Sequence, residues 1–138
     1  MNKNIIVVGA NQTGLVFAAF AKTAGFDVTV YEAKKQCDVA YDWTDDMVEE
    51  TFEEVGMPLP PKEIYTRKRN WTFVPPEKGV NVLMDLPDDQ LDMAIYRRPF
   101  NAWLLSRAEC AGVKVFYETP VKRAIVENDV VLGVELEN

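Results

Sequence analysis

A glycine-rich stretch near the N-terminus has the residue types and the spacing of a phosphate-binding turn. Residues 9–14 read GANQTG and directly follow the apolar run at residues 5–8. Gly9 would permit a tight turn, and Gly14 would let a following helix pack closely on the preceding strand. The N-terminus of that helix would offer N–H groups and a positive dipole end to a pyrophosphate. The stretch therefore predicts a nucleotide site.

An acid and an asparagine qualify this motif. Glu32 lies 18 residues beyond Gly14, at the end of the next β-rich segment, where it would accept hydrogen bonds from a ribose 2′-hydroxyl. Asn11 stands where the motif usually has its middle glycine, so its Cβ leaves either a slightly open turn or a weakly held nucleotide. The alternatives are a turn that merely connects two elements and, for Glu32, a solvated acid at a strand end.

Three elements must position these residues. The apolar run at residues 5–8 predicts a strand buried on both faces, as in a parallel sheet. A helix is expected from about Thr13 to a stop at Gly25, and residues 26–31 then alternate as in a second strand. The opening is therefore predicted to be a βαβ unit.

The next part of the chain does not continue this alternation of strands and helices. A helix is predicted to start at Thr44-Asp45-Asp46 and to stop at Gly56. Residues 71–74 and 80–84 favour a hairpin, and residues 93–96 are compatible with a third strand. Residues 45–94 carry twelve acids and five bases, a net charge of −7, whereas the rest of the chain is neutral.

The alternation of helix and strand then resumes. A helix is expected from Pro99 to a stop at Gly112, followed by a strand at residues 113–117. Residues 121–126 and 130–136 predict a closing hairpin. The fold class is therefore α/β, a Rossmann-like βαβ core with an inserted excursion of one helix and a β-hairpin.

Composition excludes several classes of function. The 138 residues contain no histidine, which removes Ser-His-Asp catalysis and the usual His-containing zinc sites, and no metal site is predicted. The net charge of −7 argues against nucleic acid and anionic membranes as partners. No apolar run is long enough to span a bilayer. Cys37 and Cys110 form no CxxC motif and follow no signal peptide, so a reducing cytoplasmic location with unpaired thiols is expected, a disulfide between the two being the alternative.

The order of these features resembles the N-terminal part of FAD-dependent oxidoreductases, closest to the geranylgeranyl reductase and FixC-like branch. The resemblance rests on the glycine-rich βαβ unit, the acid after the second strand, the excursion, the helix opened by RRPF at residues 97–100, and the TPV segment at residues 119–121 before the hairpin. It covers nearly all of this chain but only about the first third of such an enzyme, so the predicted fold is incomplete relative to the full family. Residues 1–44 and 95–138 would form the discontinuous FAD-binding domain, and residues 45–94 the start of a substrate domain.

The resemblance implies FAD as the cofactor. Gly9 and Gly14 would lie under the diphosphate, Glu32 on the adenosine ribose, Arg97 near the diphosphate, and the Val121 backbone at the adenine. The cofactor contacts it predicts are Gly9, Ala10, Asn11, Thr13, Gly14, Glu32, Ala33, Arg97 and Val121. A solvated pair at a helix start is the alternative for Arg97 and Arg98, although two cations at a helix N-terminus point to an anion nearby.

Substrate contacts and function stay more open. Tyr41 and Trp43 would wall a flavin or an apolar substrate, the alternative being a loop with two half-buried aromatic residues. No catalytic residue is assigned. The leading function is the FAD-binding portion of an oxidoreductase that acts on a prenyl-type substrate or in electron transfer. The alternatives are an NAD(P)-binding Rossmann protein and a truncated nucleotide-binding or interaction module. Either a homo-oligomer or a missing C-terminal domain would complete the predicted FAD-binding portion.

Overall fold

The computed structural model describes residues 4–77 and 79–137 and divides the chain into two compact units. The first unit holds the chain up to Tyr41 together with the segment from Asn101 onward, and the second unit is Asp42–Phe100. No helix in the described ranges is long and apolar enough to cross a membrane. The assignment of residues 45–94 to a substrate domain stays a prediction.

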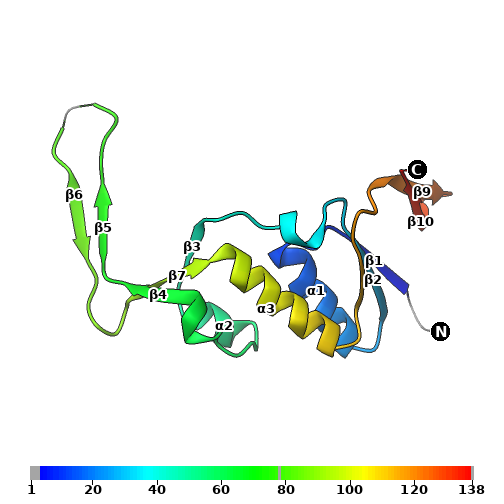
Figure 1. The fold of residues 1–138 in the computed structure, drawn as a ribbon, viewed down its shortest axis with the longest axis horizontal. Coiled ribbons are helices and arrows are strands. Elements are labelled where there is room, and N and C mark those ends of the chain that lie inside the picture. Colours follow the sequence, from blue (N-terminus) through cyan, green and yellow to red (C-terminus); the bar gives the residue numbers. More distant parts are fainter. Residues whose placement is uncertain (1–3, 78, 138) are drawn as a thin grey trace. The chain divides into compact units, whose positions relative to one another are not determined.

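The first unit is built on a parallel sheet in the order β1-β2-β8, and Figure 1 labels β1 and β2 of this sheet. Its elements are β1 (Asn4–Val8), α1 (Gln12–Thr23), β2 (Asp27–Tyr31) and β8 (Lys114–Phe116). Residue Val7 of β1 faces Val30 of β2, which faces Val115 of β8. The βαβ opening is therefore confirmed, and α1 ends as expected before Gly25, whose φ is +92°.

One expectation for β1 is wrong. Its outer residues Ile6 and Val8 are 40% and 61% exposed, so the strand is not buried on both faces. Among the described residues β1 pairs with β2 alone, which leaves it at the sheet edge. A continuous apolar run shows that both faces of a strand are able to be buried. In this structure the described residues bury only one face of β1.

The remaining elements of the first unit follow the expected order. Helix α3 (Arg97–Cys110) starts two residues before Pro99, and its part from Asn101 onward buries Leu104, Leu105 and Ala108. Strands β9 (Val121–Glu127) and β10 (Val130–Leu136) form the predicted antiparallel hairpin. Its turn places Asn128 and Asp129 at φ values of 49° and 63°, the left-handed conformation of a tight hairpin turn.

The second unit holds two small antiparallel sheets. One has the order β3-β7-β4 and the other pairs β5 with β6 (Figure 1). The bounds are β3 (Thr44–Met47), α2 (Glu50–Glu54), β4 (Tyr65–Lys68), β5 (Asn70–Phe73), β6 (Val82–Asp85) and β7 (Asp92–Tyr96). Two 3₁₀ turns, η1 (Gln36–Asp38) in the first unit and η2 (Lys62–Ile64) in the second, complete the described elements. The predicted hairpin of β5 and β6 is confirmed.

The helix predicted to start at Thr44 is wrong. Residues 44–47 form β3, in which Thr44 pairs with Tyr96 and Met47 with Met93, and the helix spans only Glu50–Glu54. Asp46, which was expected near the helix N-terminus, instead links two strands of the sheet. Its Oδ1 accepts a 3.1 Å hydrogen bond from Lys68 Nζ on β4. Strand β7 lies at the centre of this sheet, between β3 and the unpredicted β4.

Candidate functional site

The glycine-rich turn joins β1 to α1 and depends on both of its glycines. Gly9 has a φ of +101°, and its N–H donates a 2.7 Å hydrogen bond to the Tyr31 carbonyl of β2. A Cβ at Gly14 would overlap the Gly9 carbonyl oxygen and would lie 3.4 Å from Val7 Cγ1. The turn is therefore tight at Gly9, and α1 packs against it at Gly14 as expected.

Asn11 acts as the N-cap of α1. It has φ −77° and ψ 179°, an ordinary extended conformation, so this position has no conformational need for glycine. Its Oδ1 accepts a 2.9 Å hydrogen bond from Gly14 N–H. Asn11 thus uses one of the first-turn donors that an anion at the helix N-terminus would otherwise meet, while Thr13 lies in that same first turn.

Glu32 is bonded to the glycine-rich turn. The residue is only 8% exposed, and its Oε2 accepts a 2.8 Å hydrogen bond from Ala10 N–H. Oε1 accepts a 2.9 Å bond from Lys34 N–H, and the exposed Ala33 lies between these two residues. Because each carboxylate oxygen can accept two hydrogen bonds, Glu32 keeps capacity for a ribose hydroxyl while it fixes the turn.

Asn101 is a further site residue that the sequence reading missed. It is 7% exposed, and its Nδ2 lies 3.4 Å from the Ala10 carbonyl oxygen, to which it donates. Ala10 is fully buried, with its N–H held by Glu32 and its C=O by Asn101. One feature of the sequence could have indicated this role. Asn101 lies at the start of the helical repeat of buried apolar residues that continues through Leu104 and Ala108.

The segment after β8 runs beside Glu32. Thr119 N–H donates a 2.8 Å bond to the Glu32 carbonyl, and two residues later Val121 opens β9, half-buried. Tyr117 directly follows β8, and its hydroxyl oxygen is buried with no hydrogen-bond partner among the described residues. Burial, with added repulsion from Glu109 and Glu32, raises the pKa of the Tyr117 phenol.

Of the predicted contacts, the first unit brings together the turn, Glu32 and the segment leading to Val121. Arg97 belongs to the second unit, where its guanidinium pairs with Asp45 and its N–H donates a 2.9 Å bond to the Trp43 carbonyl. Arg98 Nε donates a 2.7 Å bond to Asp42. The anions expected near these cations are thus carboxylates of the chain, and the contact of Arg97 with a diphosphate stays a prediction.

The two candidate substrate aromatics are largely exposed. Tyr41 is 57% exposed at the end of the first segment of the first unit, and Trp43 is 68% exposed in the second unit. Trp43, Tyr96 and Arg97 line a shallow cavity of about 370 Å³. Both aromatics are therefore more exposed than the half-buried loop residues of the alternative interpretation, and their substrate role stays a prediction. Cys37 and Cys110 are both exposed, and neither forms a disulfide within the described residues.

Curated relatives match the chain over nearly its whole length. Digeranylgeranylglycerophospholipid reductase 1 of Methanopyrus kandleri is 31% identical over 140 residues, which cover 99% of this chain and 35% of the relative. Digeranylgeranylglycerophospholipid reductase 2 of the same organism is 31% identical over 138 residues, 99% of this chain and 33% of the relative. The chain thus spans about a third of the length of these relatives. No protein-family model matches it.

Solved structures share the fold at lower identity. A geranylgeranyl bacteriochlorophyll reductase-like protein of Thermoplasma acidophilum superposes with a TM-score of 0.77 at 16% identity, covering 99% of this chain and 35% of that one. The myxobacterial chondrochloren halogenase CndH, a FAD-dependent halogenase, gives 0.73 at 21% identity and covers 99% and 33%. The α/β fold class is therefore confirmed, as part of the fold of these larger proteins.

Together these findings confirm the predicted resemblance. The chain is similar over 99% of its length to about a third of two digeranylgeranylglycerophospholipid reductases, and its α/β fold is shared with part of a geranylgeranyl bacteriochlorophyll reductase-like protein.

Proposed function

We propose that this chain is the FAD-binding portion of a flavin-dependent reductase that acts on prenyl chains. The observation that carries the proposal is the closed turn between β1 and α1, with Gly14 packed on Gly9 and Ala10 bonded to Glu32. Such a turn brings a helix N-terminus and a ribose acceptor to the carboxyl edge of a parallel sheet, where dinucleotides bind. The substrate class follows from the relatives, which are named as reductases of digeranylgeranylglycerophospholipids.

The residues of the turn fit the adenosine diphosphate half of FAD. The packing of Gly14 on Gly9 brings the first turn of α1 close to the strand end, and Glu32 retains lone pairs for a ribose hydroxyl. Asn11, Thr13, Ala33 and Val121 border this half of the proposed site. When bound, the flavin would supply the hydride chemistry, while the chain supplies binding and orientation.

Nucleotide competition in thermal unfolding tests this proposal. FAD should raise the Tm of the purified chain, because a ligand that binds only the native state stabilises it. ADP should compete with FAD and FMN should not, since the described site addresses the adenosine half. Preference for NAD(H) over FAD would favour the Rossmann alternative instead. An absence of any Tm increase with FAD, ADP and NAD(H) would overturn nucleotide binding by this chain.

The Asn11→Gly variant sharpens the test. Removal of the Asn11 side chain releases the Gly14 N–H for a phosphate and removes a Cβ from the approach, so FAD affinity should rise by about three- to tenfold. A glycine N-cap lowers stability by only a few tenths of a kcal/mol, so the variant should stay folded. Equilibrium titration of flavin fluorescence measures the change. Affinity that stays equal or falls would show that Asn11 itself supports the bound nucleotide.

A further inference from the structure

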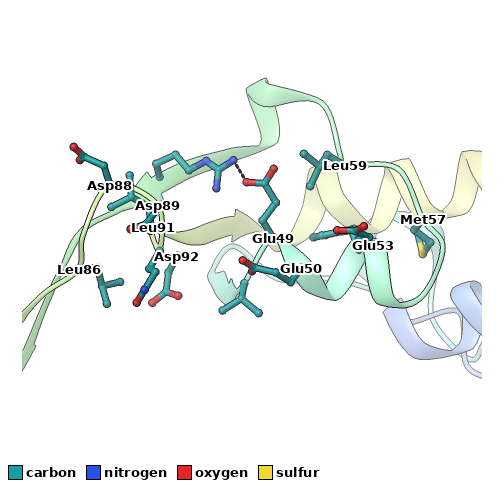
Figure 2. A pocket seen from close by; sticks show the side chains of 14 residues that line it. Glu49, Glu50, Glu53, Met57, Leu59, Leu86, Asp88, Asp89, Leu91 and Asp92 are labelled. Atoms are coloured by element: carbon teal, nitrogen blue, oxygen red, sulfur yellow. Dashed lines mark hydrogen bonds and ion pairs between the residues drawn. The ribbon is translucent and has the colours of Figure 1, made fainter.

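A groove in the second unit lies outside the candidate nucleotide site. It has a volume of about 1210 Å³ and is lined from both sides, by the segment around α2 and by the turn between β6 and β7 (Figure 2). We call it the acidic groove and define it by its lining residues, which lie within Val48–Leu59 and Leu86–Asp92, together with Arg67. None of the predicted cofactor or substrate residues lines it.

The acidic groove has an apolar component. Its apolar lining residues are Val48, Phe52, Met57, Leu59, Leu86 and Leu91. Phe52 is 4% exposed and packs edge-on against Phe100, with ring centroids 6.1 Å apart, so it anchors α2 beneath the groove. Val48 and Leu59 are 50% and 39% exposed, so they offer apolar surface to a ligand. The groove can therefore bury an apolar face of a partner.

The polar lining of the groove is strongly acidic. Six carboxylates line it, and Figure 2 shows them in two groups, one from α2 and its start and one from the β6–β7 turn: Glu49, Glu50, Glu53, Asp88, Asp89 and Asp92. Arg67, the one basic lining residue in the described part of the chain, pairs with Glu49. Asp88 pairs with Arg69, and Asp92 accepts a 2.6 Å bond from Trp71 Nε1.

Three carboxylates of the groove are without an ion-pair partner in the part of the chain that the structure describes. Glu50, Glu53 and Asp89 form no ion pair among the described residues. They lie in the part of the chain, residues 45–94, that holds the whole net charge of −7. A ligand that suits this surface must therefore bring positive charge as well as apolar area.

We propose that the acidic groove docks a Lys- and Arg-rich amphipathic helix of a partner protein. Such a helix lays its apolar stripe on Val48 and Leu59 while its basic flanks meet the carboxylates on the two sides. The volume of about 1210 Å³ exceeds the ~300–1,000 Å³ typical of small-molecule sites, which favours a peptide over a metabolite. This docking is independent of nucleotide binding.

A labelled amphipathic peptide of leucine and lysine is the probe, with fluorescence anisotropy as the measurement on the full 138-residue chain. The triple variant Glu50→Gln, Glu53→Gln, Asp89→Asn should bind about tenfold more weakly, and salt should weaken its binding less than that of the unaltered chain. The matched control is Glu54→Gln, Glu63→Gln, Glu77→Gln, which removes the same charge outside the groove and should stay within about twofold.

A second pair of variants tests the apolar component. Leu59→Ser should weaken peptide binding, whereas Leu83→Ser, in an exposed leucine of β6 outside the groove, should not. Equal peptide affinity in the two triple variants would overturn the proposal. Displacement of the peptide by spermine together with no effect of Leu59→Ser would overturn it as well, because the groove would then be a site for small polycations. Circular dichroism of each variant verifies its fold.

Discussion

Among the described glycines, Gly14 leaves the least room for a Cβ atom. A Cβ there would overlap the Gly9 carbonyl and would lie 3.2 Å from the Gly9 carbonyl carbon, and neither atom can move without opening the turn. We expect Gly14→Ala to lower the free energy of unfolding by about 3 kcal/mol, at the upper part of the range for overpacked sites. Urea denaturation of the purified variant measures this change.

Gly133 provides the matched control for this substitution. It lies in β10, and a Cβ there has no neighbour within 4 Å. Gly133→Ala should therefore leave stability unchanged or raise it by a few tenths of a kcal/mol through the unfolded state. Equal effects at the two glycines would contradict the described packing of α1 on the turn.

Tyr117 gives a pH-dependent prediction. Burial raises the pKa of its phenol, so the folded state favours the neutral form. Its contribution to stability is complete below the unfolded pKa of about 10 and is lost as the pH rises from there through the folded pKa. Tyr117→Phe should remove this alkaline loss, which is seen by comparing the urea midpoints of the two proteins between neutral pH and the alkaline range.

The same variant carries its own control at neutral pH. The Tyr117 hydroxyl has no described hydrogen-bond partner, so its loss leaves no group unpaired, and stability should change by no more than about 1 kcal/mol. A large destabilisation at neutral pH would show that the hydroxyl is hydrogen-bonded in solution.

Among the site residues, those set by local chain geometry could be predicted and those set by distant partners could not. Gly9 and Gly14 follow from the conformations and the close packing that a turn between strand and helix requires. The bond from Asn101 to Ala10 joins positions 91 residues apart, and nothing in the local sequence specifies its acceptor. Glu32 was predicted as a ribose acceptor, but its bond to Ala10 was not.

At the scale of elements, the same distinction explains the error at residues 44–47. Thr44-Asp45-Asp46 has the composition of a helix N-cap, which is a local signal. The strand it forms depends on β7, about fifty positions later, and on the ion pairs of Asp45 with Arg97 and of Asp46 with Lys68. The β9–β10 hairpin was predicted correctly because its partner strands are adjacent in sequence.

The turn of this hairpin allows a stabilising change. Asp129 has a φ of 63°, a conformation that disfavours a side chain and suits glycine. We expect Asp129→Gly to raise the free energy of unfolding by about 0.5–1 kcal/mol, since an Asn-Gly pair is preferred in such turns. Asp129→Ala should lower it, because alanine lacks the tolerance of aspartate for this region. Thermal unfolding distinguishes the two, and the opposite order would contradict the described turn.

At the scale of the whole molecule, charge and apolar surface are distributed unevenly. The excess acidity lies in residues 45–94, which leaves the rest of the chain neutral where the diphosphate is proposed to bind. Exposed apolar side chains occur on β1 of the first unit and on β6 of the second. The uneven charge and the exposed apolar side chains are found in a chain that spans about a third of the length of its relatives.

The edge of β1 predicts self-association of the isolated chain. Val8 and Ile6 are exposed on a strand that pairs only with β2 among the described residues. Edge strands with apolar side chains favour intermolecular pairing, and lysine opposes it. Val8→Lys should therefore lower the concentration-dependent increase in sedimentation coefficient, whereas Val55→Lys, at the end of α2, should leave it unchanged. An unaltered profile for Val8→Lys would exclude β1 as the contact.

The double anchoring of Ala10 also bears on biosynthesis. Its N–H is held by residue 32 and its carbonyl by residue 101, so during synthesis the turn receives its last hydrogen bond only after 91 further residues have been added. Contacts of such long sequence separation form late, because the intervening loop must close first. The nascent βαβ unit would thus carry an unfinished form of the proposed nucleotide site, and acquisition of the proposed cofactor would follow synthesis of α3 rather than accompany synthesis of α1.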